Sequence, residues 1–319
     1  MKKNLLITAC LAFASLSSFG ASLASIMLQH NGNVTMYDPD KMSSAINDAV
    51  AGDTIYMSEG AFTGDFTINK AVCIIGAGQN TKIQGNITIS IDNTPTLTAH
   101  MLDAVSMGNN SVTVSKAVKN LKFRKCYFNS LTINASTTDL SIDRCRIEDF
   151  YPQTNVKSGN VLNSYFYRLR GASSQTNTIN FINCNIYYFY NYSNALSATF
   201  INCLICSYDW NTQINNCVFI NTRYPSNFSI QATTSVQNCW TGGDFTQYTE
   251  EATNVSYYTI DSEWLQNNNY LGTDGTIIGM FGGTSPYSLV PNVPTVTESK
   301  VSVDTANKKL NVSLKVTAN

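Results

Sequence analysis

Apolar residues in the middle of the chain fall into short clusters that share one pattern. Each cluster has an apolar residue, two mostly polar residues, a small residue that is usually Cys, and a second apolar residue two positions further on. Seven segments follow this pattern: 123–128, 142–147, 161–166, 181–186, 200–205, 214–219 and 236–241. Their small residues recur at intervals of 19, 19, 20, 19, 14 and 22. Such a repeat indicates a stack of similar structural units.

The spacing inside one unit indicates short strands joined by tight bends. The small residue and the apolar residue two positions later follow strand alternation, whereas the apolar residue three positions earlier breaks it. The chain therefore bends between them, and Asn tolerates the left-handed conformation that a one-residue corner needs. Asn163, Asn183, Asn202, Asn216 and Asn238 stand at this bend. One such unit cannot bury its apolar side alone, but stacked copies can, which predicts a β-solenoid.

This repeat resembles the right-handed parallel β-helix of the pectin-lyase-like superfamily, whose coils carry asparagine ladders at such a corner. Four apolar residues with helical spacing predict an α-helix over 40–51 that caps the solenoid. Segments 52–60 and 72–78 are similar to the entry coils of secreted β-helix proteins of Gram-negative bacteria. The resemblance implies an all-β fold with coils of about 19 residues and leaves the activity open, because this architecture hosts lyases, hydrolases, adhesins and scaffolds.

The ends of the chain predict further parts. Residues 1–24 have a basic start, an apolar stretch and small residues, as in a secretory signal peptide, with a lipoprotein anchored at Cys10 as the alternative. We expect the β-helix over 25–292, with a loop or bulged coil at 94–110. Strict alternation over 293–319 predicts a terminal β-hairpin.

Composition narrows the function classes. Charged residues make up 13% of the chain, with 37 Asn and 17 Tyr, which disfavours a helical bundle. The net charge of −1 has no long run of either sign, so nucleic acid is not expected as a partner. No stretch reaches the ~18 to 20 apolar residues of a membrane span, so no transmembrane segment is expected. The signal predicts export to the periplasm, the cell surface or the exterior.

The cysteines follow the repeat. Cys126, Cys145, Cys184, Cys203, Cys217 and Cys239 share one inward position, where Ser164 substitutes once. This predicts a stack of buried thiols, with disulfides between neighbouring coils as the alternative. Cys203 and Cys206 are the sole close pair and lack a second pair at zinc spacing, so neither a metal nor another cofactor is expected.

The outward positions supply the candidate chemistry. Side chains at the same distance along the sequence from the small residue of each unit should stack in a column on the outer surface. This places Asp149 beside Arg168 in one column, and Arg170 in the adjacent column. The simplest interpretation is a surface salt bridge. A polysaccharide lyase could use Arg168 or Arg170 as the base, and a hydrolase would need Glu148 as a second acid beside Asp149.

Tyrosines dominate the same outward positions, in the run 187–192 and one coil earlier. Aromatic faces beside Arg and Asn donors stack well on sugar rings, although strands favour Tyr for structural reasons alone. We therefore predict a secreted or cell-surface protein without catalytic activity that binds a polysaccharide or cell-surface glycan. The alternatives are a lyase or hydrolase of acidic polysaccharide and a purely structural envelope protein or adhesin. The predicted contact residues are Tyr127, Tyr165, Tyr167, Tyr187, Tyr188, Tyr190, Arg168 and Arg170. The oligomeric state stays open.

Overall fold

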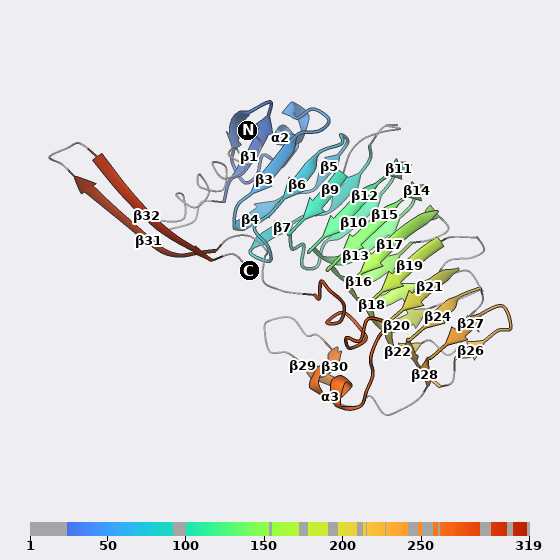
Figure 1. The fold of residues 1–319 in the computed structure, drawn as a ribbon. Helices are drawn as coiled ribbons and strands as arrows, with labels where there is room; N and C mark the ends of the chain where they lie inside the picture. Colours follow the sequence, from blue (N-terminus) through green and yellow to red (C-terminus); the bar gives the residue numbers. More distant parts are fainter. Residues whose placement is uncertain are drawn as a thin grey trace.

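The computed structural model shows an all-β chain whose short strands wind into coils stacked along one axis (Figure 1). It describes residues 24–91, 100–152, 155–171, 178–190, 197–208, 213–214, 216–226, 228–241, 248–250, 258–260, 262–287, 295–304 and 309–317. The expected signal peptide and Cys10 lie outside the described residues, except for Ala24.

Two large sheets form the walls of the solenoid. The 12-stranded sheet has the order β2-β1-β3-β6-β9-β12-β15-β17-β19-β21-β24-β27, and the 10-stranded sheet the order β28-β25-β22-β20-β18-β16-β13-β10-β8-β5. From β3 onward their strands pair in parallel with the strands one coil away. This arrangement confirms the predicted right-handed parallel β-helix.

The strand bounds are as follows. The 12-stranded sheet contains β1 (Ile26–His30), β2 (Asn33–Tyr37), β3 (Thr54–Met57), β6 (Cys73–Ile75), β9 (His100–Asp103), β12 (Leu121–Arg124), β15 (Leu140–Asp143), β17 (Ser158–Leu162), β19 (Thr178–Ile182), β21 (Ala198–Ile201), β24 (Val218–Ile220) and β27 (Ser235–Gln237). The 10-stranded sheet contains β5 (Phe66–Ile68), β8 (Ile87–Ile89), β10 (Ser111–Val114), β13 (Tyr127–Ile133), β16 (Arg146–Tyr151), β18 (Tyr165–Arg170), β20 (Asn185–Tyr190), β22 (Leu204–Tyr208), β25 (Arg223–Tyr224) and β28 (Trp240–Thr241). Short pairs are β4 (Gly60–Thr63) with β7 (Thr81–Gln84), β11 (Val118–Lys119) with β14 (Thr137–Thr138), β23 (Gln213–Ile214) with β26 (Ser229–Ile230), and β29 (Tyr248–Glu250) with β30 (Tyr258–Ile260).

The corner between the two large sheets is the predicted left-handed bend. Asn163, Asn183 and Asn202 have φ of 45°, 51° and 54°, and Asn238 has φ of 49°. Arg144 has the same conformation, with φ of 51°, in a coil without Asn at this position. The corner is thus set by the stacking of coils, and Asn lowers its conformational cost.

The inward residues of the stacked coils form a continuous apolar core. Phe181, Phe200 and Phe219 stack as parallel rings, with centroids 5.0 Å apart at both steps. Cys126, Cys145, Cys184 and Cys203 are buried at the expected column, and Cys239 is half-buried. All eight described cysteines are free thiols in this structure.

Cys217 does not belong to the predicted column. Its actual member in that coil is Thr222, which follows the left-handed Asn221 and accepts the Cys203 N–H at 3.2 Å. Cys217 lies directly before β24, at a different position of the coil, because Asn216 marks a second left-handed corner in the same coil. The repeat is therefore more regular here than the interval of 14 suggested.

Residues 100–110 also differ from the prediction of a loop or bulged coil. Strand β9 pairs in parallel with β6 and β12, and a left-handed corner follows at Ala104, with φ of 55°. The coil is regular, but Ala104 and Val105 stand where later coils have Asn and Cys. The remaining part of the predicted irregular region, residues 94–99, lies outside the described residues.

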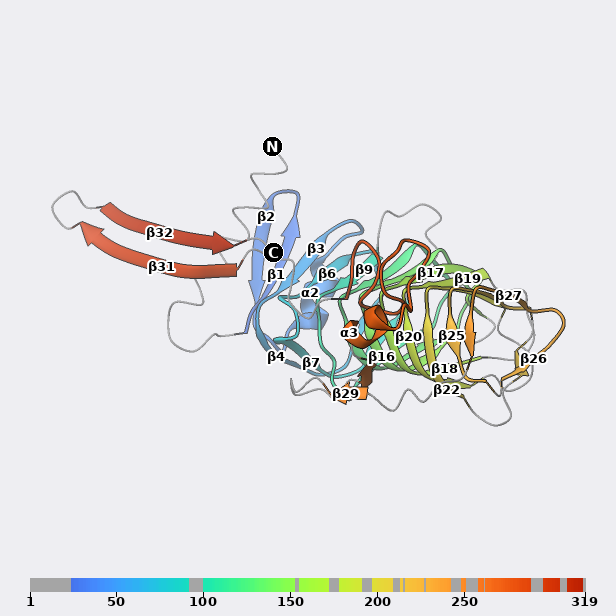
Figure 2. The same ribbon diagram turned by 60° about the horizontal axis from the view of Figure 1, so that its bottom comes forward.

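The N-terminal end of the stack is covered by a hairpin and a helix. Strands β1 and β2 pair antiparallel, and β1 continues the 12-stranded sheet through β3. Helix α2 (Met42–Asp48) lies within the predicted range 40–51 and buries Met42, Ala45 and Ile46 in the main core. Figure 2 shows these elements at one end of the coils.

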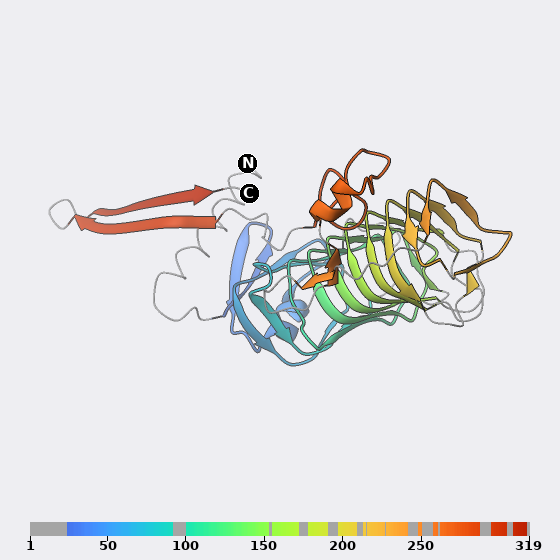
Figure 3. The same cartoon turned by 90° about the horizontal axis from the view of Figure 1, so that it is seen from below.

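A segment after the coils folds back along them. It comprises α3 (Ser262–Asn267) and the turns up to residue 287, and we call residues 262–287 the C-terminal cover (Figure 3). Asn163 Nδ2 donates to the carbonyl oxygens of Met280 and Gly282, at 3.2 and 2.7 Å. The C-terminal cover is thus anchored on the corner asparagines. The last strands, β31 (Thr295–Asp304) and β32 (Lys309–Thr317), form the predicted antiparallel hairpin.

Candidate functional site

The outer face of the 10-stranded sheet carries two columns of side chains as predicted. The first column runs Ser111, Ser130, Asp149, Arg168, Tyr188 and Ser207, each paired with the next across adjacent strands. In the second column Thr132 pairs with Tyr151, and Arg170 pairs with Tyr190. Strands β16, β18 and β20 bring these residues together because their parallel register is constant (Figure 1).

Asp149 is the centre of this surface. Its Oδ2 accepts from Arg168 Nη2 at 2.6 Å, and its Oδ1 accepts from Arg170 Nε at 3.2 Å. The Asp149 side chain is 13% exposed, whereas those of Arg168 and Arg170 are 35% and 28% exposed. One carboxylate therefore orients two guanidinium groups at the surface of the sheet.

Tyrosine rings surround the two arginines. The guanidinium carbon of Arg170 lies 4.8 Å from the ring centroid of Tyr151 and 5.1 Å from that of Tyr190. The Arg168 guanidinium lies 5.4 Å from the Tyr167 ring. Cation–π contacts of this kind hold a guanidinium in place while leaving its edge accessible.

The rings also stack on one another. Tyr167 and Tyr187 are 5.2 Å apart with an interplanar angle of 12°, and Tyr188 and Tyr190 are 5.1 Å apart at 26°. All four are half-buried. We call the group the Tyr/Arg cluster; it consists of Asp149, Tyr151, Tyr167, Arg168, Arg170, Tyr187, Tyr188 and Tyr190.

The Tyr/Arg cluster carries a positive excess of one charge, because two arginines face one carboxylate. Asp149 binds Nη2 of Arg168 and Nε of Arg170, and Nε of Arg168 is buried, so a ligand would be bound by the other Nη donors of these two half-exposed side chains. Fixed guanidinium donors between aromatic rings are suited to a carboxylate or sulfate on a ring-shaped ligand.

Two of the predicted contact residues lie elsewhere. Tyr165 is only 1% exposed, so its prediction as a contact residue is wrong. It shares a column with Tyr127, Arg146 and Asn185, and the C-terminal cover reaches this column through a 2.9 Å hydrogen bond from Met280 N to Asn185 Oδ1. Burial raises the pKa of the Tyr165 hydroxyl. Tyr127 is half-buried beneath the Arg146 guanidinium, 4.8 Å from its ring centroid, and does not join the Tyr/Arg cluster.

The two acids considered for hydrolysis are each bound to arginines. Glu148, the candidate second acid, accepts from Arg146 Nε at 2.5 Å, and Asp149 is bound by two arginines. Both carboxylates are therefore held in ion pairs with arginines, so neither is a free carboxyl at this surface. Arg168 and Arg170 both donate hydrogen bonds to Asp149, and a guanidinium group is in general a poor proton acceptor in proteins.

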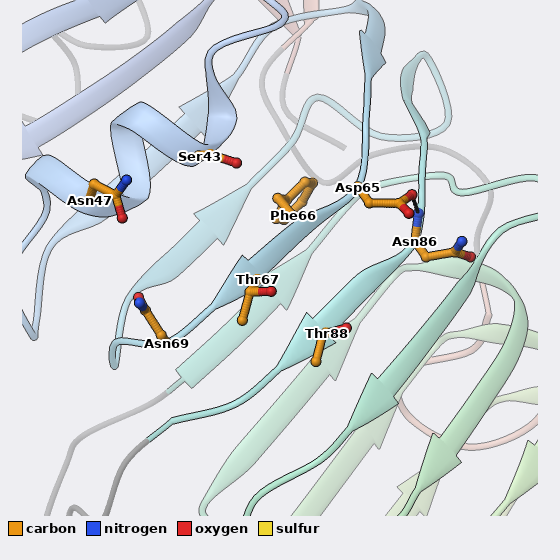
Figure 4. A pocket seen from close by; sticks show the side chains of 8 residues that line it. All are labelled: Ser43, Asn47, Asp65, Phe66, Thr67, Asn69, Asn86 and Thr88. Carbon is orange, nitrogen blue, oxygen red and sulfur yellow. Dashed lines mark hydrogen bonds between the residues drawn. The ribbon is translucent and has the colours of Figure 1, made fainter.

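A pocket of about 300 Å³ lies on the same face of the 10-stranded sheet, near its N-terminal end (Figure 4). Strands β5 and β8 contribute Thr67 and Thr88, and helix α2 contributes Ser43 and Asn47. The lining also includes Asp65, Phe66, Asn69 and Asn86. Hydroxyl and amide groups predominate, so the pocket is suited to a polar ligand.

Within the part of the chain that the structure describes, no group of three His, Cys, Asp or Glu side chains could hold a metal ion. No helix among these residues is long and apolar enough to span a membrane.

Sequence reasoning missed two parts of this face. Tyr151 is not among the predicted contact residues, because only its contact with Arg170 reveals its role. The pocket residues lie in coils without the Asn and Cys signature, so the repeat did not align them. The run of Thr at positions 67, 88, 113 and 132 was the available signal.

Comparisons with known proteins assign no function to the chain. No family model matches the chain, and no curated protein matches it. Among solved structures, a match is the pectin methylesterase from Aspergillus niger in deglycosylated form, with 13% identity and a TM-score of 0.31, over 68% of this chain and 87% of that chain.

Proposed function

We propose that this chain is an exported protein that binds an acidic polysaccharide through the Tyr/Arg cluster without cleaving it. The observation that carries the proposal is the pair of guanidinium groups held by Asp149 between tyrosine rings. Rigid side chains lose little entropy on binding, and Arg168 and Arg170 are already oriented before a ligand arrives. The rings supply contact area for sugars, and the arginines supply donors for their acidic groups.

A binding role is favoured over cleavage by the ion pairs of the same surface. A lyase needs an uncharged base, and a hydrolase needs one protonated and one free carboxyl. Asp149 and Glu148 are both bound to arginines, so neither offers the free carboxyl that hydrolysis needs. The alternative of a lyase or hydrolase using Arg168, Arg170 and Asp149 is tested in the same experiment, because it requires product.

Affinity electrophoresis in gels containing polygalacturonate, alginate or hyaluronate tests the proposal. We expect at least one polymer to retard the protein, and Arg170→Gln and Tyr188→Ala each to weaken that retardation. Tyr56→Ala is the matched control, because Tyr56 is a half-buried tyrosine of β3 in the other large sheet. Solutions of protein and polymer are assayed in parallel for reducing ends and for unsaturated uronates.

Retardation without product, lost in the cluster variants and kept in the control, supports the proposal. Product formation that Arg170→Gln abolishes would establish the enzyme instead. Equal mobility of all variants in every gel would refute binding at the Tyr/Arg cluster. The alternative of a purely structural role would then be favoured.

A further inference from the structure

The Tyr/Arg cluster lies at one end of a longer polar surface. In the second column, Thr67 pairs with Thr88, Thr88 with Thr113, and Thr113 with Thr132, before Tyr151 follows. Four hydroxyl-bearing side chains thus stand in one line that leads from the pocket to the cluster. Figure 4 shows Thr67 and Thr88 beside each other on β5 and β8.

The hydroxyl groups at the start of this line have no hydrogen-bond partner among the residues that the structure describes. Among the described residues, no hydrogen bond from the side chains of Thr67, Thr88 or Thr113 is found. Further along, Ser130 and Thr132 lie 3.4 Å apart through their hydroxyl oxygens. Hydroxyls both donate and accept and rotate to suit, so an unpaired row of them matches the hydroxyls of sugar rings.

The first column adds amide and hydroxyl groups beside this line. Asp65 Oδ1 accepts from the backbone N–H of Asn86 at 2.7 Å, and Asn86 Oδ1 accepts from that of Ser111 at 3.0 Å. These bonds fix the side chains of Asp65 and Asn86 at the edge of the pocket. The pocket therefore has defined polar walls, as expected for a site that takes the end of a chain of sugars.

We infer that the outer face of the 10-stranded sheet is a linear track for the uncharged part of a polysaccharide, running from the pocket along Thr67, Thr88, Thr113 and Thr132 to the Tyr/Arg cluster. Four steps between strands lead from β5 to β16, the first strand of the Tyr/Arg cluster. At ~4.8 Å a step the track is about 19 Å long, which several sugar rings would cover. The inference extends the proposed function beyond the Tyr/Arg cluster.

The two ends of the track differ in charge. The Tyr/Arg cluster has an excess of one positive charge, whereas the pocket contains Asp65 and no basic side chain in its lining. A uronate at the pocket would be repelled by this carboxylate. The track from the pocket to Thr132 is accordingly assigned to neutral sugars.

The experiment uses affinity electrophoresis of the full chain in gels containing hydroxyethylcellulose, xyloglucan or galactomannan, which are uncharged. The test variant is Thr88→Val/Thr113→Val/Thr132→Val, which removes three hydroxyls but keeps the shape of each side chain. The matched control is Thr138→Val/Thr199→Val, at half-buried threonines of β14 and β21 on other faces of the coils.

We expect a neutral polymer to retard the native protein, and the test variant to bind it roughly tenfold more weakly, because three hydrogen bonds are lost. The control should keep native retardation, and circular dichroism should show the same thermal midpoint for all three proteins. No retardation by any neutral polymer, or equal retardation of test variant and control, would overturn the track.

Failure of the proposed function and failure of the track give different experimental results. Arg170→Gln reports on polygalacturonate at the Tyr/Arg cluster, and the threonine variant reports on the neutral polymers along the track. A threonine effect on neutral polymers with no arginine effect on polygalacturonate would support the track and reject the acidic ligand. The reverse result would support the acidic ligand and reject the track.

Discussion

Phe200 is the residue whose removal tests the stacked core most severely. Its ring lies in β21 between Phe181 and Phe219, 5.0 Å from each, and its side chain is 0% exposed. Phe200→Ala leaves a cavity that the flanking coils cannot close, because their backbone hydrogen bonds fix the coil spacing. We expect a loss of about 3–5 kcal/mol of unfolding free energy. The value should lie near the upper end, since each ring contact contributes about 0.5–1.5 kcal/mol beyond burial.

Equilibrium unfolding in urea, followed by circular dichroism, measures this loss. Val236→Ala is the control, because Val236 follows Phe219 in the same column but is 41% exposed. A change of about 0.5 kcal/mol or less is expected there. A cost below about 1 kcal/mol for Phe200→Ala would show that the coil register described for β19, β21 and β24 is wrong.

The buried thiols and the C-terminal cover give further predictions. In native protein the five buried thiols should resist iodoacetamide, and all eight thiols described as free should react after denaturation, as counted by mass spectrometry; two or fewer would indicate disulfides. Burial raises the pKa of Cys217 from 9.0 to about 11 and that of Cys184 in the same direction, so these thiols ionise more readily when unfolded. Their contribution to stability is present below pH 9 and falls as the pH rises toward 11, which urea unfolding across that window measures; a flat profile would contradict it. Gly279→Ala would press a methyl group onto Asn185 Oδ1 and should speed proteolysis of the C-terminal cover, whereas Gly275→Ala, with a similar positive φ and open space, should not.

The β-helix was predictable because its signal repeats. A single coil of short strands is ambiguous, but Phe181, Phe200 and the cysteines after each corner recur at nearly constant spacing. Asn216 shows where this signal misleads. A coil has more than one left-handed corner, and Asn suits each of them. Cys217 follows Asn at the other corner and was therefore assigned to the wrong column.

The site was predictable only in part. The equal spacing of Asp149 and Arg168 from the small residue of their coils correctly predicted that they are neighbours, since this placement depends only on local strand alternation. The burial of Tyr165 was missed because its column is also reached by a distant part of the chain, where Met280, more than a hundred residues later, binds the adjacent Asn185. No local pattern reports such a contact. The coil at Ala104 escaped notice for a related reason, because stacking imposes the left-handed corner even where the residue does not favour it.

Hydroxyl-radical footprinting tests the central claim, that the Tyr/Arg cluster is the ligand surface, most directly. The protein is exposed to radicals with and without the polysaccharide that retards it most, and oxidation of each tyrosine is read by mass spectrometry. We predict that oxidation of Tyr167, Tyr188 and Tyr190 falls severalfold in the complex, while that of Tyr56 in β3 is unchanged. Unchanged oxidation of the cluster tyrosines, or protection of Tyr56 alone, would contradict the account.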